Sequence, residues 1–480
     1  FGSSLGLIHT FPLATSCSNR YRTEMAAEPS LSAKCLAEFI GTFLLIFTVE
    51  SNVLTGDSVF AGLSIGAVLF VSIQALGGIS GGNFNPAVSV ALGCLQSLKG
   101  PGMDWKQVGI YSVVQILGGL LAALSAVTIF GKSANLAVTP GYGKFGAGIG
   151  ELLYTFMLCF VVLNVAAAKK NKEEKGQYYA LAIGFCVVSG AYGAGVLSGG
   201  AFNPAVAFAL DVTSLSQGFG TCFLYIIFEL LGALLAALAF CVVRPTDVGG
   251  IESPGKRREQ LCSEFLGTFI LVLTVTCNIL GNSQTAALSI ACSLSAMIYA
   301  LGDVSGGHFN PAVSCAVFCS GRDATFTGMK AVLYAIVQIF GGTAAAFIGA
   351  GIFGQHMTSL GPKAPYFLSN ALLVELVFTF TLAYVVLSVA VSAVTKTTHF
   401  FGLAIGFCVV VGGFACGNVS GGSLNPAVSL ALALSGGGLG NAMGYGLVEL
   451  LAGMLAATAF KVTHPKELET AEAKGITSDP

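Results

Sequence analysis

The sequence predicts an all-α integral membrane protein built from two repeated units, each with six spanning helices and two half-length helices. Three observations lead to this prediction. Apolar stretches of about twenty residues recur along the chain, only 9% of its 480 residues are charged, and one nine-residue phrase occurs four times. A soluble domain needs polar cover, so a chain that is 54% apolar, with a mean hydropathy of +0.81, has the lipid bilayer as its solvent.

The basic residues are unevenly placed, although the net charge is only −1. With the first span at residues 34–54 and the sides alternating from there, one side collects most of them. The positive-inside rule makes that side cytoplasmic. Both chain ends then lie in the cytoplasm, which requires an even number of spans, twelve. That side holds Lys169, Lys170, Lys172, Lys175, Arg244, Lys256, Arg257, Arg258, Lys396, Lys461 and Lys466, against Lys132, Lys144 and Lys363 on the other.

The first 24 residues have the charge pattern of a targeting segment, because Arg20 and Arg22 precede the first acid, Glu24. The alternative, which we favour, is that Met25 is the natural start and the residues before it are read through from upstream. Most of the 14 cysteines lie inside apolar spans, where Cys acts as a small apolar residue. With no CxxC pair and no His/Cys cluster, we expect no metal, no cofactor and no disulfide framework.

Each of the two repeated units itself consists of two similar halves. The phrase Ser-Gly-Gly-x-(Phe/Leu)-Asn-Pro-Ala-Val occupies residues 80–88, 198–206, 305–313 and 420–428. A Glu phrase opens each half, at 37–43, 150–156, 263–269 and 374–380, and a Gln or Glu phrase stands in the last span of each half. Each half therefore has three spans, and the halves of a unit enter the membrane from opposite faces. The predicted organisation is an N-terminal segment at 1–31, units at 32–243 and 260–463, a cytoplasmic linker at 244–259 and a tail at 464–480.

Each Asn-Pro segment predicts a short helix, because Asn is a favoured N-cap and Pro a favoured first helical residue. About ten residues reach only halfway across a bilayer. Two half-helices from opposite faces would then meet at the midplane, with positive dipole ends and Asn amides facing a passing molecule. The alternative is a purely structural role, in which these phrases are only helix-start signals. The phrases are Asn85-Pro86-Ala87, Asn203-Pro204-Ala205, Asn310-Pro311-Ala312 and Asn425-Pro426-Ala427.

These four phrases, at corresponding positions across residues 33–463, resemble the hallmark of the aquaporin, or major intrinsic protein, family. The resemblance implies two six-helix barrels, each with two re-entrant half-helices and one pore. It also implies that a first-helix carboxylate in each half accepts hydrogen bonds from the half-helix loops, whereas a carboxylate inside a span could alternatively relay protons. These carboxylates are Glu38, Glu151, Glu264 and Glu375. Glu229 and Glu449 depart from the family's usual Gly-Pro, and they either brace helix packing or face another protomer.

The narrow filter of the family is located by counting from the Asn residues. Its strongest member, an Arg, is replaced by Val206 and Val428, and its His by Ala191 and Gly413. Both filters are expected to be wide, apolar and poor in donors. The sequence fits neither the water-selective nor the glycerol-conducting pattern, so water, ammonia, urea and hydrogen peroxide all stay open. The predicted filters are Ile65, Ala191, Gly200 and Val206, and Ile290, Gly413, Gly422 and Val428.

The predicted function is a passive channel for water or small neutral solutes. A gated ion channel is one alternative, because loss of the Arg lowers the barrier to cations. A structural or adhesive membrane protein with vestigial pores is another. No catalytic constellation or phosphate-binding motif favours an enzyme, and no basic domain favours nucleic acid. The resemblance implies four barrels around one axis, hence a homodimer of chains. His308, where the first unit has Asn83, is expected to line a cytoplasmic vestibule, either as a plain hydrogen-bonding group or as a pH gate.

Overall fold

The computed structural model describes residues 28–56, 59–174, 177–357, 360–397 and 399–465. Met25, Lys175 and Lys466, together with the predictions about the two ends of the chain, lie outside the described residues. Within the described part, ten helices are long and apolar enough to cross a membrane. Six shorter apolar helices accompany them, and four of these begin directly after an Asn of the repeated phrase.

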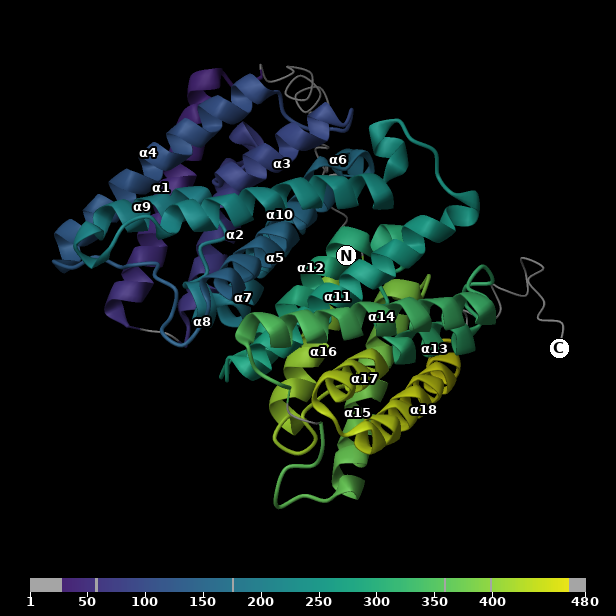
Figure 1. Cartoon of the computed structure of the whole chain (residues 1–480). Helices are drawn as coiled ribbons and strands as arrows, with labels where there is room; N and C mark the ends of the chain where they lie inside the picture. Colours follow the sequence, from purple (N-terminus) through teal and green to yellow (C-terminus); the bar gives the residue numbers. More distant parts are fainter. Residues whose placement is uncertain (1–27, 57–58, 175–176, 358–359, 398, 466–480) are drawn as a thin grey trace, which may run out of the picture.

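The first unit forms one bundle, coloured purple to teal in Figure 1. Its spanning helices begin at polar caps where the chain offers them: the Ser30 hydroxyl accepts from Ala33 N at 3.2 Å, and the Asp104 carboxylate accepts from Gln107 N at 3.1 Å. Its helices are α1 (Leu31–Thr55), α2 (Ala61–Ser80), α3 (Pro86–Ser97), α4 (Trp105–Phe130), α5 (Lys144–Val162), α6 (Lys169–Glu174), α7 (Tyr179–Gly193), α8 (Gly195–Ser198), α9 (Pro204–Thr213) and α10 (Thr221–Val243).

The second unit repeats this order in the green and yellow bundle of Figure 1. Thr327 caps its third spanning helix, as Asp104 does in the first unit. Its helices are α11 (Arg257–Leu280), α12 (Ala286–Ser305), α13 (Pro311–Ser320), α14 (Gly328–Phe353), α15 (Leu368–Val386), α16 (Phe401–Cys416), α17 (Pro426–Gly436) and α18 (Leu439–Thr463).

Each bundle is an aquaporin-like barrel of six helices with two re-entrant half-helices, so the predicted fold is confirmed. We call the side on which α1 begins the first face. α3 and α13 run from the middle of their bundles toward the first face, and α9 and α17 run toward the opposite face. The fifth span of each unit is shorter than a full crossing, because α7 and α16 end where the Gly-rich approach to the second half-helix turns inward.

The segment predicted as a cytoplasmic linker, residues 244–259, contains two short 3-10 turns and the start of α11. α11 begins at Arg257, inside the predicted 244–259 range, and a 3-10 turn spans Pro245–Val248. Arg244 is 8% exposed, and its guanidinium donates to both carboxylate oxygens of Asp303, at 2.6 and 2.9 Å. It also donates to Asn164 Oδ1 at 2.7 Å and to Ala300 O at 3.0 Å. Asn164 lies in the first unit, Arg244 directly follows α10, the last helix of that unit, and Asp303 lies in the second unit, so these residues join the two barrels.

The barrels pack through α5 and α7 of the first unit against α11 and α12 of the second. Two serines bond reciprocally across this joint, since Ser189 Oγ donates to Ser289 O and Ser289 Oγ to Ser189 O, both at 3.1 Å. Nearer the first face, the rings of Tyr178 and Tyr299 stack with their centroids 4.5 Å apart. The helices at this joint are accordingly far more buried than α1, α2 or α15.

Candidate functional site

The four Asn residues cap the four half-helices. The backbone of Asn85 is extended, and its side-chain Oδ1 accepts from Ala87 N at 2.8 Å. Pro86 follows at the first helical position, where no backbone donor is needed. The same arrangement recurs at the other three half-helices, with cap distances between 2.8 and 3.0 Å: Asn203 to Ala205, Asn310 to Ala312, and Asn425 to Ala427.

The same Asn side chains join the half-helices in pairs. Asn85 Nδ2 donates to Phe202 O at 2.8 Å, and Asn203 Nδ2 donates to Phe84 O at 2.9 Å. In the second unit, Asn310 bonds Leu424 O and Asn425 bonds Phe309 O in the same reciprocal way. Since an amide nitrogen carries two N–H groups, each Asn keeps one further donor. The helix N-termini add positive partial charge at the same place.

The residue before each Asn holds a left-handed backbone, with φ between 48 and 53°. This conformation is costly for a residue with a large side chain, so the surrounding structure must enforce it. The enforcement comes from buried carboxylates. Glu38 accepts from Asn83 N at 3.0 Å, from Phe84 N at 2.8 Å and from the Ser80 hydroxyl at 2.6 Å.

The other three carboxylates have corresponding contacts. Each accepts from the Ser that opens the repeated phrase and from the two backbone N–H groups before the Asn, and all four are fully buried. These bonds supply the acceptors that the left-handed turn needs inside the membrane. The three remaining carboxylates are Glu151, Glu264 and Glu375.

Sequence reasoning missed a tyrosine in the last span of each half, and three of these four tyrosines bond the loop before a half-helix. Tyr111 OH donates to Ser80 O at 2.8 Å, and Tyr334 and Tyr445 make the equivalent bonds to Ser305 O and Ser420 O. Tyr225 occupies the corresponding place on α10, but its hydroxyl has no hydrogen-bond partner. A signal was present in the sequence, because each Tyr stands four residues before the Gln or Glu of its last span.

The Gln or Glu of the last span differs between the halves. Gln115 Nε2 donates to Glu38 at 2.8 Å, and Gln338 donates equally to Glu264. In the second halves a carboxyl takes that place. Glu229 accepts from Asn203 N at 2.9 Å and lies within hydrogen-bonding reach of Glu151.

Glu449 accepts from Asn425 N at 3.1 Å and from the Ser429 hydroxyl at 3.2 Å. Glu229 and Glu449 are both fully buried inside their own barrels. Of the two alternatives, this burial favours a bracing role within the barrel.

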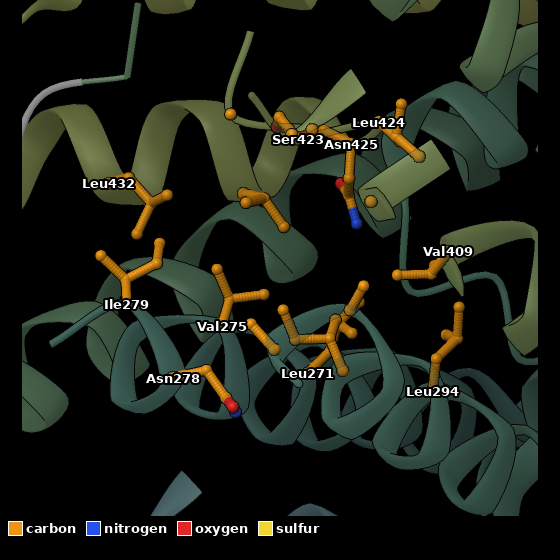
Figure 2. Close-up of a pocket in the computed structure, with 18 of the residues that line it drawn as sticks. Leu271, Val275, Asn278, Ile279, Leu294, Val409, Ser423, Leu424, Asn425 and Leu432 are labelled. Atoms are coloured by element: carbon orange, nitrogen blue, oxygen red, sulfur yellow. The ribbon is translucent and has the colours of Figure 1, made fainter. Parts of the chain in front are cut away.

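The predicted filter positions of the second unit meet in one cavity of about 830 Å³. One wall carries residues 421–425, with the Asn425 amide directed inward, and the facing wall carries Leu271, Val275 and Ile279 of α11 (Figure 2). Polar and cationic groups, including Gln355, His356 and Lys363, line its end away from the first face. All four predicted filter residues and both capping amides line this cavity: Ile290, Gly413, Gly422, Val428, Asn310 and Asn425.

The first unit presents its predicted filter residues in equivalent places. Ile65, Ala191 and Gly200 are partly exposed and Val206 is 3% exposed, the same pattern as in the second unit. A Cβ built on Gly62 of α2 would lie 3.1 Å from the Ala191 Cβ, so α2 and α7 approach closely here.

His308 and Asn83 make the same contact in the two units. His308 Nδ1 lies 3.1 Å from the Ser314 hydroxyl, and Asn83 Nδ2 donates to the Ser89 hydroxyl at 3.0 Å. The His308 ring is 8% exposed and packs against Phe326, with centroids 4.8 Å apart. It lines both the filter cavity and a second cavity on the first face.

Helices that cross the bilayer around paired, capped half-helices define a class of protein, the multi-pass membrane channels. The chain belongs to the major intrinsic protein family: the family model matches residues 25–240, 149–282 and 250–460. The repeated match agrees with a tandem duplication. Members of this family are channels and not enzymes.

Individual relatives match about half of this chain. A glycerol uptake facilitator protein-like 6 of Lactiplantibacillus plantarum is 35% identical over 222 residues, covering 45% of this chain and 99% of its own. Aquaporin AqpM of Methanothermobacter thermautotrophicus is 32% identical over 247 residues, covering 44% and 97%. Among solved structures, the aquaglyceroporin from Plasmodium falciparum is similar at 22% identity with a TM-score of 0.39, covering 45% and 99%.

Proposed function

We propose that each unit, residues 32–243 and 260–463, forms one pore for water and at least one larger neutral solute. The observation that carries this proposal is the composition of the filter cavity. Ile290, Gly413, Gly422 and Val428 contribute no charge and no side-chain donor to it. A filter without Arg and His is wider and replaces fewer of the hydrogen bonds that water loses on entry, so larger solutes pass.

Exclusion of ions then depends on the middle of each pore. There the remaining Asn N–H donors and the half-helix dipoles favour an oxygen atom and oppose a cation. Leu271, Val275 and Ile279 of α11 offer no replacement for a hydration shell. Neutral solutes that present an oxygen or a lone pair, including urea, hydrogen peroxide and ammonia, fit these conditions. Similarity to the glycerol uptake facilitator protein-like 6 of Lactiplantibacillus plantarum supports adding glycerol to this set.

A stopped-flow panel on proteoliposomes tests the proposal. The full chain is reconstituted and challenged with gradients of sucrose, urea, glycerol and hydrogen peroxide. We expect water flux and flux of at least one larger solute to exceed those of empty liposomes, with no current under voltage clamp. A protein that passes water alone contradicts the filter assignment, and a measurable current supports an ion channel instead.

The distribution of basic residues supports a cytoplasmic position for the first face. Lys169, Lys170, Arg244, Lys256 and Lys396 all belong to segments on that face. Both chain ends are then cytoplasmic. Cysteine labelling of intact cells at residues 170 and 363 tests this orientation, since only the latter position should react with an impermeant reagent.

The joint between the barrels supports a dimer of chains. By the repeat, α1 and α2 correspond to α11 and α12, and α15 and α16 correspond to α5 and α7. Val71 of α2 is 53% exposed while its counterpart Ala296 is buried, and Val411 of α16 is 53% exposed while its counterpart Ser189 is buried. A second chain, related to the first by a two-fold axis, would place α15 and α16 of each chain against α1 and α2 of the other. The two chains would then close a ring of four barrels.

Native mass spectrometry in detergent tests this assembly. The expected mass is twice the 49.0 kDa of one chain. A Val411→Lys variant places a charge in the proposed contact and should yield single chains. A native mass of one chain or four chains for the wild type contradicts the dimer.

A further inference from the structure

The second pore opens on the first face into a cavity of about 880 Å³ that both units build. Lys170, Asn171 and Tyr178 come from the first unit, and the remaining lining residues come from the second. His308, Val386 and Ile405 line this cavity and the filter cavity alike, so the two meet there. We call this space on the first face the basic vestibule.

Positive charge predominates in the basic vestibule. Among the side chains that the structure describes, four cationic groups line it, against two carboxylates. Both carboxylates already have partners: Asp303 accepts from Arg244 at 2.6 Å, and Asp323 accepts from the backbone N and the hydroxyl of Thr325, at 2.8 and 2.7 Å. Lys170 lies 3.9 Å from Asp303. The four cations are Lys170, Arg322, Lys330 and Lys396.

The groups near the inner end of the basic vestibule favour an anion. The Lys330 ammonium lies over the rings of Phe326 and Tyr334, 5.5 and 5.7 Å from their centroids, beside His308. None of the ion pairs found among the described residues includes Lys330. Nδ1 of His399, on the loop before α16, is buried without a hydrogen-bond partner. Arg322, Lys330 and His399 line this same cavity, and ammonium and guanidinium groups suit the several acceptor oxygens of a phosphate group.

The barrel itself does not require these cations. Counting from the capping Asn residues, Arg322 corresponds to Ser97, and counting from the last-span tyrosines, Lys330 corresponds to Gln107. The first unit has the same fold with neutral residues at both positions. These two charges are therefore not needed for the fold, and they distinguish the second pore from the first.

We propose that the basic vestibule binds a phosphate group from the cytoplasm and that the bound anion slows passage through the second pore. The anion stops at the depth of His308, because Val386 and Ile405 begin an apolar passage that would leave it unsolvated. The binding part of this proposal stands on the cavity alone. The effect on flux rests on the proposed channel function and on the first face being cytoplasmic.

The test begins with binding to the purified full chain. Inorganic phosphate is titrated calorimetrically at constant ionic strength, with chloride as the compensating anion. We expect saturable binding, weakened about tenfold or more in an Arg322→Ser, Lys330→Gln variant, because each charge-assisted hydrogen bond contributes on the order of a factor of ten. A Lys106→Gln, Lys461→Gln variant removes the same charge from exposed helix ends and should bind as the wild type does. Equal weakening in both variants, or no saturable binding, overturns the site.

Flux measurements then separate the source of the phosphate from the channel function. Proteoliposomes of neutral lipid are loaded with phosphate, and a parallel set contains phosphatidic acid without free phosphate. We expect solute flux to fall in part, with the first pore still conducting, and the vestibule variant to lose this inhibition. Inhibition in either set supports the site and identifies its source, whereas unchanged flux in both sets overturns regulation. If no variant conducts but phosphate still binds, the channel function fails and the site stands.

Discussion

Glu229 occupies the position that Gln115 has in the first half of the unit. A carboxyl group in place of an amide here requires one bound proton if it is to donate a hydrogen bond as Gln115 does. Gln115 donates an N–H to Glu38, but a carboxylate in the same place has nothing to donate to Glu151. Oε2 of Glu229 indeed has no donor directed at it. Two ionised carboxylates within hydrogen-bonding reach of each other, both fully buried, would repel each other strongly. We infer that the pair shares one proton, which lets Glu229 donate as Gln115 does.

A Glu229→Gln substitution tests the shared proton. We expect wild-type thermal stability and solute flux, because the amide can still accept from Asn203 N while donating to Glu151. Glu229→Leu should lower the free energy of unfolding by about 1–3 kcal/mol, since it leaves buried polar groups without partners. Thermal unfolding in detergent measures both variants. A Gln variant as unstable as the Leu variant contradicts the shared proton.

The filter assignment is tested by restoring the missing charge. Val206→Arg together with Val428→Arg should reduce flux of the larger solute more than flux of water, because a guanidinium narrows the opening and supplies donors. Stopped-flow rates on the same liposomes measure both fluxes. Val206→Leu with Val428→Leu controls for bulk alone. If the Arg variant leaves solute flux unaltered, these valines do not line the narrowest point.

His308 is buried and already has a hydrogen-bonding partner. The ring is buried against Phe326 and lies near the Lys330 ammonium, and its Nδ1 bonds Ser314. We therefore expect His308→Asn, which installs the residue of the first unit, to leave the pH response of flux between about pH 5 and 8 unchanged. A flattened pH profile in the variant would establish the gating alternative.

At the scale of helices, close crossings hold the half-helices in place. Where α14 crosses α11, a Cβ on Gly341 would lie 2.5 Å from the backbone oxygen of Phe265. Gly118 and Gly232 make the same approach to α1 and α5, at 2.6 and 2.5 Å. Glu264, Glu38 and Glu151 lie on α11, α1 and α5. A shift at one of these helix crossings would therefore move the carboxylate that accepts hydrogen bonds from the loop before the half-helix. Small residues at helix contacts serve this purpose in membranes, where backbones must approach closely.

A Gly341→Ala substitution should therefore destabilise the second barrel by about 1–3 kcal/mol, the usual cost of overpacking. Gly351 lies on the same helix, and a Cβ there meets nothing within 4 Å. Gly351→Ala is thus a matched control, expected to be neutral or slightly stabilising through helix propensity. Thermal unfolding in detergent compares the two. Equal effects would show that the crossing tolerates a methyl group.

At the scale of the whole molecule, Arg244 and Asp303 join the barrels at one edge only. Their counterparts at the free edges are His464 and Gly78, which cannot form an ion pair. The joint within a chain therefore differs from the proposed joint between chains. In the proposed ring, this ion pair is present only between the two barrels of one chain.

Asp303→Asn should lower the free energy of unfolding by about 3–5 kcal/mol, because it leaves the Arg244 charge buried without its counter-ion. The exposed pair of Lys256 and Glu252, 3.0 Å apart, provides the control. Lys256→Gln should cost at most about 1 kcal/mol. Calorimetric unfolding in detergent measures both. A loss no larger than that of the control would show that the ion pair does not hold the barrels together.

The sequence by itself determined the fold, the duplication and the positions of the capping residues. Hydropathy, the repeated Asn-Pro phrase and the odd number of spans per half are local or periodic properties, so no contact information was needed to read them. Tertiary structure alone decided which distant groups meet. The tyrosine bonds to the half-helix loops, the Glu151–Glu229 pair and the basic vestibule join residues tens to hundreds of positions apart. Arg244, predicted to lie in a linker, is buried for the same reason: its partner Asp303 reaches it only once the second barrel has packed against the first.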